Sequence, residues 1–396
     1  MAVQFLGRME TVEMAEVATT GAKPVRILLA DDQADILDAL QLLLKPGGYQ
    51  TKAVSQPSAV AEALRAETFD LLLIDLNYTR DTTSGGEGLD LLAQIRSIDE
   101  NVPVLVMTAW STVDLAVEAM RRGASDFVQK PWQNRRLLEK IEEQVERHRS
   151  LVSRQRSHDA ELREAHDIQQ NLLPKTIPQV ARFAIAASSQ PFRVVGGDYY
   201  DVVRIGDTQT AFAIGDVAGK GLPAALLMSN VQAALRPLML DRTEPQELCR
   251  RLNQTLCDVT LVGKFVSFFY CVLDSDTRRL TYCNAGHNPP LLIRAGGKVE
   301  ALTSGDAVLG LFPAWWFSQR TVELNPGDAL VLFTDGVVEA CGRSGEPFGE
   351  ERLVKVAQQN RDLGTERLHG VILAAASEHC GGHFQDDVSL VVLQAA

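Results

Sequence analysis

Four acidic motifs in the second half of the chain each place a carboxylate beside a residue that permits a tight turn. They read GGDYYD at 196–201, GDVAGKG at 215–221, TDG at 334–336 and QDDVS at 385–389. Carboxylates converging from four separate turns would repel one another, and a pair of hard divalent cations would neutralise them, because Mg²⁺ and Mn²⁺ prefer oxygen ligands. Such metal pairs are used to hydrolyse phosphate esters. The motifs therefore predict a binuclear metal site that acts on phosphate.

Composition narrows the class of protein. The 396 residues are enough for two or three domains. A net charge of −12 without a basic stripe argues against nucleic-acid binding. No apolar run approaches the ~20 residues of a membrane span, and residues 1–23 lack the pattern of a secretion signal. The six cysteines form no C-x-x-C pair, so we expect reduced thiols, a cytoplasmic location and no membrane partner.

The first third of the chain alternates short apolar runs with amphipathic stretches. Runs at 25–30, 71–74 and 104–107 are unbroken, which is typical of a parallel sheet covered by helices on both faces. Such a doubly wound sheet places its ligands at the carboxyl ends of its strands. The residues that follow the runs, and a fourth short strand at 126–128, are Asp31, Asp32, Asp75, Thr108 and Lys130.

This constellation resembles a response-regulator receiver domain. The resemblance implies that Asp75 is the phosphoacceptor and that Thr108 and Lys130 bind the phosphoryl group. An Asp carboxylate is a competent nucleophile toward a phosphorylated donor once a metal and a Lys neutralise the phosphate. The implied ligands of Mg²⁺ are Asp31, Asp32, Asp75 and Asn77.

Two further features bear on this resemblance. Phe127 occupies the position of the family's aromatic switch residue, whereas the polar loop 77–87 lacks the Met-Pro that commonly follows the acceptor. The loop leaves the phosphodonor and the lifetime of the phosphoryl group open. The alternative is that Asp31 and Asp32 merely cap a helix and Lys130 is a surface charge, but five such residues in receiver order argue against it.

A charged stretch at 135–172 contains no Gly or Pro. Its apolar residues recur at steps of three and four, which predicts a helix, with a polar interruption at 153–160. The stretch resembles a signalling helix that forms a coiled coil with a second copy, which predicts a homodimer; a single helix packed on a domain is the alternative. The stripe consists of Leu138, Ile141, Val145, His148 and Val152, and then Leu162, Ala165, Ile168 and Leu172.

Beyond the helix the pattern changes to strands separated by turn signals, with long helical stretches at 223–240 and 245–261 and a third at 350–360. Strand pairs with intervening helices indicate an α+β domain of antiparallel sheets flanked by helices. The chain then divides into a mobile tail, a receiver domain, a helical linker ended by two prolines, and this last domain. The expected bounds are 1–23, 24–134, 135–174 and 175–396.

The acidic motifs, together with IQQNLLP at 168–174 and NAGHNPP at 284–290, resemble the PPM-type serine/threonine phosphatases of the RsbU/SpoIIE branch. The resemblance implies two packed antiparallel sheets with helices outside and two Mg²⁺ or Mn²⁺ ions at one end. It assigns one metal to Asp198, both metals to Asp216 with the carbonyl of Val217, and the other metal to Asp335 and Asp386, with Asp387 in support.

The mechanism expected of such a site needs no protein nucleophile. A water between two divalent ions loses a proton near neutral pH and can attack phosphorus in line. Arg193 is a candidate to grip the phosphate, as an arginine does elsewhere in the superfamily, although an exposed Arg can simply be solvated. His287 lies between two turn-forming residues, which favours a structural tie over a catalytic acid.

Two other phosphate chemistries fit poorly. GDVAGKG has three residues where a P-loop has four, and Gly221 replaces the Ser or Thr that binds Mg²⁺. A cysteine-dependent phosphatase needs an Arg six residues after its Cys, and none of the six cysteines has one.

The combined expectation is a two-component output protein. A histidine kinase or small phosphodonor phosphorylates Asp75, the helix transmits the signal, and the phosphatase acts on phosphoserine or phosphothreonine of a partner. The resemblance implies an anti-sigma-factor antagonist with a STAS fold as that partner. The rivals are a non-catalytic adaptor that has lost its metals and an assembly module whose output is the helix. Retention of all four metal-site Asp residues favours the enzyme, while the sign of control and the choice of Mg²⁺ or Mn²⁺ stay open.

Overall fold

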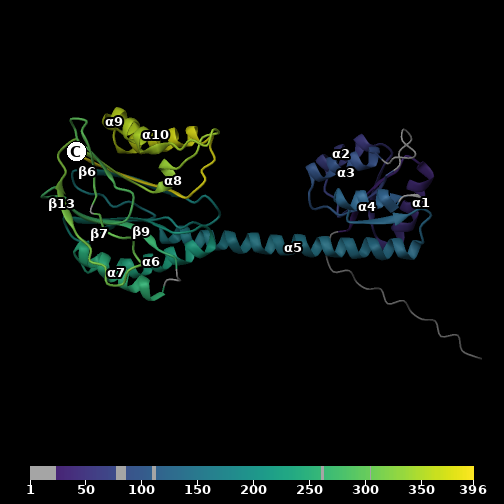
Figure 1. The fold of residues 1–396 in the computed structure, drawn as a ribbon, viewed down its shortest axis with the longest axis horizontal. Coiled ribbons are helices and arrows are strands. Elements are labelled where there is room, and N and C mark those ends of the chain that lie inside the picture. The colour runs from purple at the N-terminus through teal and green to yellow at the C-terminus, as the bar shows by residue number, and fades with distance from the viewer. Residues whose placement is uncertain (1–23, 77–85, 109–112, 260–262, 304) are drawn as a thin grey trace, which may run out of the picture. The chain divides into compact units, whose positions relative to one another are not determined.

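The computed structural model describes residues 24–76, 86–108, 113–259, 263–303 and 305–396. The chain divides into two compact units, and the boundary between them falls between His158 and Asp159 (Figure 1). The expected tail at 1–23 and the loop at 77–85, which includes the expected Mg²⁺ ligand Asn77, lie outside the described residues.

The first unit is built on a parallel sheet, five-stranded over the described ranges, with strand order β2-β1-β3-β4-β5. The order reverses beside β1, so the carboxyl ends of β1 and β3 form the switch point at which sheets of this kind bind ligands. Every residue of β3 and β4 is buried, as expected for strands covered on both faces. The strands are β1 (Arg26–Ala30), β2 (Gln50–Val54), β3 (Leu71–Asp75), β4 (Val104–Thr108) and β5 (Asp126–Gln129).

Helices cover both faces of this sheet. On one face α2 (Pro57–Ala66), α3 (Gly86–Ile98) and α4 (Val113–Arg121) enclose one apolar cluster. On the other, α1 (Ala34–Leu44) and the first turns of α5 (Asn134–Leu172) enclose a second cluster. The doubly wound receiver fold predicted from the sequence is confirmed.

Helix α5 is continuous over its 39 residues, through the polar stretch that interrupts its apolar stripe. Ile141 and Val145, which the apolar stripe assigned to a coiled coil, are instead buried in the core of the first unit. The alternative of a helix packed on a domain therefore holds for this part. Farther along, Leu151 is 56% and Ile168 59% exposed, so apolar surface available for pairing lies beyond Val145.

The second unit contains two antiparallel sheets, in the orders β13-β10-β9-β8-β7 and β12-β11-β14-β15-β6 over the described residues. The predicted α+β class is confirmed. The first sheet comprises β7 (Tyr199–Arg204), β8 (Gln209–Val217), β9 (Val266–Asp274), β10 (Arg279–Ala285) and β13 (Arg320–Glu323). The second comprises β6 (Phe183–Gln190), β11 (Leu291–Ile293), β12 (Val299–Ala301), β14 (Ala329–Phe333) and β15 (Val388–Ala395).

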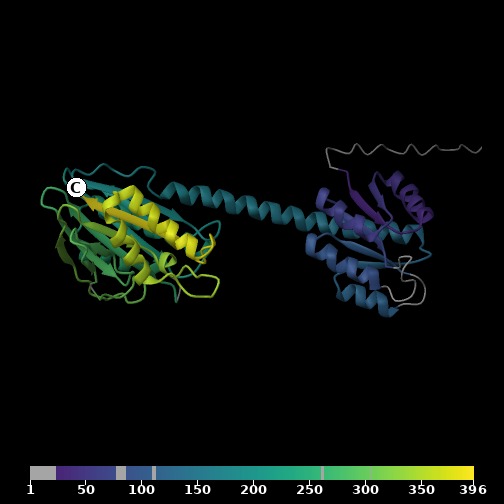
Figure 2. The same ribbon diagram turned by 90° about the horizontal axis from the view of Figure 1, so that it is seen from above.

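Helices lie outside both sheets of this unit. α6 (Leu222–Leu240) and α7 (Pro245–Val259) lie on one side, and α8 (Asp335–Val338), α9 (Gly349–Asn360) and α10 (Thr365–His379) on the other (Figure 1). Figure 2 shows the last two, in yellow, lying over the strands.

Strand β14 shows how the layers are built. Side chains alternate across a strand, so Leu330 and Leu332 join the core between the sheets, while Val331 and Phe333 pack toward α9 and α10. Among the helices that the structure describes, none is long and apolar enough to cross a membrane.

Replacing Ile141 by Ala should lower the free energy of unfolding by roughly 2–5 kcal/mol, because it leaves a cavity in the core of the first unit. Leu151→Ala, on the same helix but exposed, should change it by no more than about 0.5 kcal/mol. Urea unfolding of the full chain measures both. Equal effects of the two substitutions would contradict the packing of α5 described here.

Candidate functional site

An acidic site lies at the carboxyl ends of β1 and β3. Carboxylate oxygens of Asp31, Asp32 and Asp75 lie within 4.8 Å of one another. Lys130 Nζ bridges two of them, at 2.6 Å from Asp31 Oδ2 and 2.9 Å from Asp75 Oδ2. Burial disfavours the charge on Lys130, but the hydrogen bonds to Asp31 and Asp75 outweigh burial and raise its pKa. The cluster has the oxygen ligands that Mg²⁺ prefers. The ammonium group of Lys130 lies beside Asp75, the expected phosphoacceptor.

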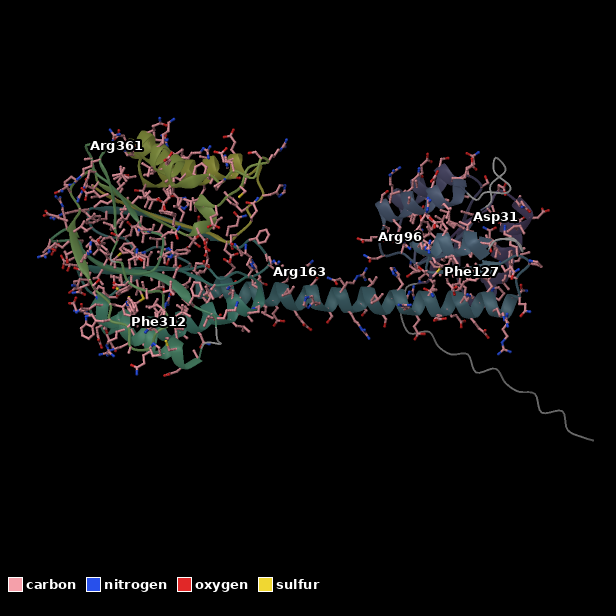
Figure 3. The ribbon with its side chains drawn as sticks, in the orientation of Figure 1. Asp31, Arg96, Phe127, Arg163, Phe312 and Arg361 are labelled. Atoms are coloured by element: carbon pink, nitrogen blue, oxygen red, sulfur yellow. The ribbon has the colours of Figure 1, made fainter. Side chains whose placement is uncertain are left out.

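The other receiver residues surround this cluster. Thr108 is buried at the end of β4, and its carbonyl oxygen accepts a hydrogen bond from the backbone N–H of Lys130 at 2.7 Å. Phe127 is 42% exposed, and Lys140 of α5 lies over its ring. Figure 3 labels Asp31 and Phe127 in this unit. The strand that leads to Lys130 is therefore in contact with α5.

The four acidic motifs of the second unit lie where strands of its two sheets end or begin. Asp198 precedes β7 and Asp216 is near the end of β8, and the pairing of Tyr199 with Gly215 brings these two ends together. Asp335 begins α8, just after β14, and Asp386 lies in the turn before β15. Strand pairing thus brings together acidic motifs that lie far apart in the sequence.

Asp198 is a buried carboxyl group. Thr334 Oγ1 donates to its Oδ2 at 2.7 Å, while its Oδ1 has no hydrogen-bond partner among the described residues. Burial, and after it the charge of Asp216, raise the pKa of Asp198 well above its usual value. A buried carboxylate oxygen without a partner is costly, and a cation is the natural group to satisfy it.

The pKa values of Asp216 and Asp335 are also raised by burial and by neighbouring carboxylates. Burial, followed by the charges of Asp335, Asp386 and Asp387, raises the pKa of Asp216 to about 7. Burial, followed by the charges of Glu339 and Asp386, raises the pKa of Asp335 to about 6. The motifs therefore converge closely enough for their carboxylates to oppose one another's ionisation.

Lys220 supplies positive charge to this cluster. Its Nζ lies 2.5 Å from Asp386 Oδ2 and donates to the carbonyl oxygen of Gln385 at 2.8 Å. It also lowers the pKa values of Asp216 and Asp335, against the larger effect of burial. The sequence analysis used Lys220 only to exclude a P-loop and missed its place here.

The adjacent residues Asp386 and Asp387 have different surroundings. Both carboxylate oxygens of Asp387 accept backbone hydrogen bonds, Oδ1 from Phe192 at 2.7 Å and Oδ2 from Gly197 at 2.6 Å. A Cβ at Gly336 would overlap the carbonyl oxygen of Asp387, so this contact requires glycine. Asp387 thus fastens the loop before Asp198, which leaves Asp386 as the better candidate for a metal.

Two more predicted residues have clear surroundings. His287 is buried, and hydrogen bonds join it to Asn284 and Ser267. Burial lowers the pKa of His287 to about 4, so the imidazole is neutral at pH 7 and behaves as a structural tie. Arg193 is exposed beside Gly221, close to the chain of the GDVAGKG motif.

Sequence reasoning also gave no role to Thr334 and Gln169. Thr334 lies inside the TDG motif and bonds both Asp198 and the backbone of Ser389. Gln169 lies inside IQQNLLP, and its side-chain amide bonds the backbone of Gly196. Their positions within quoted motifs were the only signal available in the sequence.

Comparison with known proteins finds a family match in each of the two units. Residues 27–142 match the response regulator receiver domain, and residues 206–396 match Stage II sporulation protein E (SpoIIE). The chain therefore carries a response-regulator receiver domain over residues 27–142 and a SpoIIE-type PPM phosphatase domain over residues 206–396.

Particular relatives show the same likeness. Protein IcfG of Synechocystis sp. is 30% identical over 262 residues, which cover 59% of this chain and 41% of IcfG. Phosphoserine phosphatase RsbU of Bacillus subtilis is 29% identical over 248 residues, covering 62% of this chain and 73% of RsbU. The crystal structure of the RsbU and RsbW domains of Rv1364c from Mycobacterium tuberculosis aligns with a TM-score of 0.50 and 28% identity, over 55% of this chain and 61% of that one.

The raised carboxyl pKa values predict how stability depends on pH without metal. Asp216 and Asp335 have folded-state pKa values of about 7 and about 6, above the unfolded value near 3.9. Their contribution to stability is complete below the unfolded pKa and is lost as pH rises through 6 to 7. In EDTA the melting temperature should therefore fall between pH 5 and pH 8, by roughly 2–4 °C per kcal/mol.

Differential scanning calorimetry at the two pH values measures this effect. Asp216→Asn should flatten the profile, and excess Mn²⁺ should raise the melting temperature most at pH 8, where the carboxylates are ionised. A metal-free profile identical in the unaltered chain and in Asp216→Asn would contradict the assignment.

Proposed function

We propose that this chain is a phosphorylation-controlled protein serine/threonine phosphatase with a binuclear metal site. Its ligands are Asp198, Asp216 with the Val217 carbonyl, Asp335 and Asp386. One observation carries the proposal: burial and the charges of neighbouring motif carboxylates raise the pKa values of Asp198, Asp216 and Asp335, which come from three different motifs. Bound cations would favour the ionised form of such a cluster near neutral pH.

The residues present suit two hard divalent cations, Mg²⁺ or Mn²⁺. The donors are carboxylate and carbonyl oxygens, and Asp198 offers a buried oxygen with no partner in the described part of the chain. Lys220, in contact with Asp386, shows that the cluster accepts positive charge. Two such ions, when bound, would lower the pKa of a water molecule and so make it a nucleophile toward phosphorus.

The chain's own residues orient this site and its substrate. Thr334 holds Asp198 from one side, and Asp387 holds the loop that precedes it. Lys220 and the exposed Arg193 lie on the rim, where positive charge favours an incoming phosphate. In this proposal no side chain forms a covalent intermediate.

The substrate class is phosphoserine or phosphothreonine on a protein. Similarity to a phosphoserine phosphatase, RsbU, supports it. The RsbU/SpoIIE resemblance further suggests a STAS-type anti-sigma-factor antagonist as the partner. These assignments rest on similarity over part of each relative.

Control is assigned to the receiver domain. Asp75 accepts phosphate from a histidine kinase or small phosphodonor, with Mg²⁺ held by Asp31, Asp32 and Asp75 and with Lys130 against the phosphoryl group. The bridging contacts of Lys130 support this role. Helix α5 extends from this unit into the phosphatase unit, and we assign to its exposed apolar residues beyond Val145 the pairing of two copies.

Asp216→Asn should lower the Mn²⁺-dependent hydrolysis of p-nitrophenyl phosphate by roughly 100-fold or more, because it removes the charge proposed to be shared by both ions. Asp207→Asn, at an exposed turn, is the matched control and should leave turnover unchanged. Turnover surviving in Asp216→Asn, or absent from the unaltered chain on both this ester and a phosphoprotein, would favour the non-catalytic adaptor.

Beryllofluoride, which mimics phosphorylated Asp, should change turnover of the full chain by roughly 5-fold or more, within the usual range of coupling between sites. Asp75→Asn should abolish that change, whereas Asp90→Asn, an exposed carboxylate of the same unit, should preserve it. A beryllofluoride effect on dimerisation without an effect on hydrolysis would instead support the assembly module, with sedimentation velocity as the measurement.

A further inference from the structure

The side chain of Gln169 makes an unusual contact for a residue of a polar helix. Its Nε2 donates to the carbonyl oxygen of Gly196 at 2.7 Å, and its Oε1 accepts from the N–H of the same residue at 3.1 Å. The amide thus satisfies both backbone groups of one glycine. One turn earlier on α5, His166 Nδ1 lies 2.6 Å from the carbonyl oxygen of Val194. Residues three apart share a helix face, so one face of α5 holds the segment 194–196 at two points.

Gln169 is buried, whereas the neighbouring residues of the helix are not. Between Val145 and Leu173, Gln169 is the only residue classed as buried, with 6% of its surface exposed. A polar side chain is costly to bury unless its hydrogen bonds are satisfied. An apolar residue would serve simple packing better, so the amide is present for what it bonds.

The bonded segment leads directly to a proposed metal ligand. Gly197, the next residue, donates its N–H to Asp387 Oδ2, and Phe192 donates to Oδ1 of the same carboxylate. Gly196 and Gly197 have no side chains to pack, so these backbone hydrogen bonds fix the course of the loop. Asp198 follows immediately, with its carboxylate oriented by Thr334.

We infer that Gln169 is a positioning residue for the metal site: by holding both backbone groups of Gly196, it aims the carboxylate of Asp198 at the ions. The inference deepens the proposed function and rests on it. Gln169 does not bind the metal itself but supports the loop that carries a proposed ligand. Mutation of residues that orient metal ligands typically changes metal affinity or activity by roughly 10–100-fold.

The test compares Gln169→Met with Gln170→Met in the full chain. Methionine is similar in length and cannot reproduce the paired hydrogen bonds, and Gln170 is the neighbouring glutamine on the same helix, only partly buried. The Mn²⁺ concentration for half-maximal hydrolysis of p-nitrophenyl phosphate should rise roughly 10–100-fold in Gln169→Met, with most of the turnover returning at saturating Mn²⁺. Gln170→Met should behave as the unaltered chain.

Hydrogen exchange supplies a readout independent of activity. In Gln169→Met the backbone amides of residues 192–198 should lose protection, while those of β8 and β14 keep theirs. Gln169→Leu removes the same two hydrogen bonds with an apolar side chain that suits a buried helix position, so it should give the same local loss of protection. This variant decides the question if Gln169→Met does not fold.

Unchanged exchange and Mn²⁺ dependence in Gln169→Met would overturn the inference. So would a uniform loss of protection across the unit in both Gln169 variants, which would reveal a general structural role. If the unaltered chain shows no metal-dependent hydrolysis, the proposed function fails, and the local exchange contrast still decides whether Gln169 positions the loop.

Discussion

Repulsion between buried carboxylates is the constraint around which the phosphatase unit is arranged. Strand pairing in two sheets brings Asp198, Asp216, Asp335 and Asp386 together, and burial strengthens their opposition. The neighbouring groups offset it: a hydroxyl donates to one carboxylate, and a lysine contacts another. In this arrangement the backbone carbonyl of Asp387 approaches Gly336 so closely that no side chain would fit at this position. The site is therefore costly to form in the ionised state, and the proposed cations would offset that cost.

The receiver unit also brings carboxylates close together, but fewer of them. Asp31, Asp32 and Asp75 lie close together, and Lys130 bridges two of them. In both units a lysine contacts an acidic cluster, yet the surroundings suit different chemistry. Asp75 is a single carboxylate placed beside a cation and a buried threonine, which suits phosphoryl transfer to the protein. The four carboxylates of the other unit suit a pair of ions and transfer to water.

Much of the fold and the position of the acidic motifs could be predicted from the sequence, because both follow from local patterns. Unbroken apolar runs predicted the parallel sheet and the acidic residues at the ends of its strands, and turn-flanked carboxylates predicted a second acidic cluster in the last domain. Periodicity was less informative for α5, since the same stripe suits a coiled coil or a domain face, and Ile141 proved to be buried in the receiver core. Contacts such as that of Gln169 with Gly196 have no periodic signature, because a side chain that bonds a distant backbone leaves no pattern in either segment.

The grip on the segment 192–197 uses backbone atoms of that segment throughout. Gln169 bonds the amide and carbonyl of Gly196, His166 lies against the carbonyl of Val194, and Asp387 bonds two backbone N–H groups. The side chains of 192–194 are meanwhile exposed at the rim of the site. Substitution of the exposed Val194 can therefore alter the surface offered to a phosphoprotein while the backbone hydrogen bonds around it keep the following carboxylate in place, so recognition can change without catalysis within one short loop.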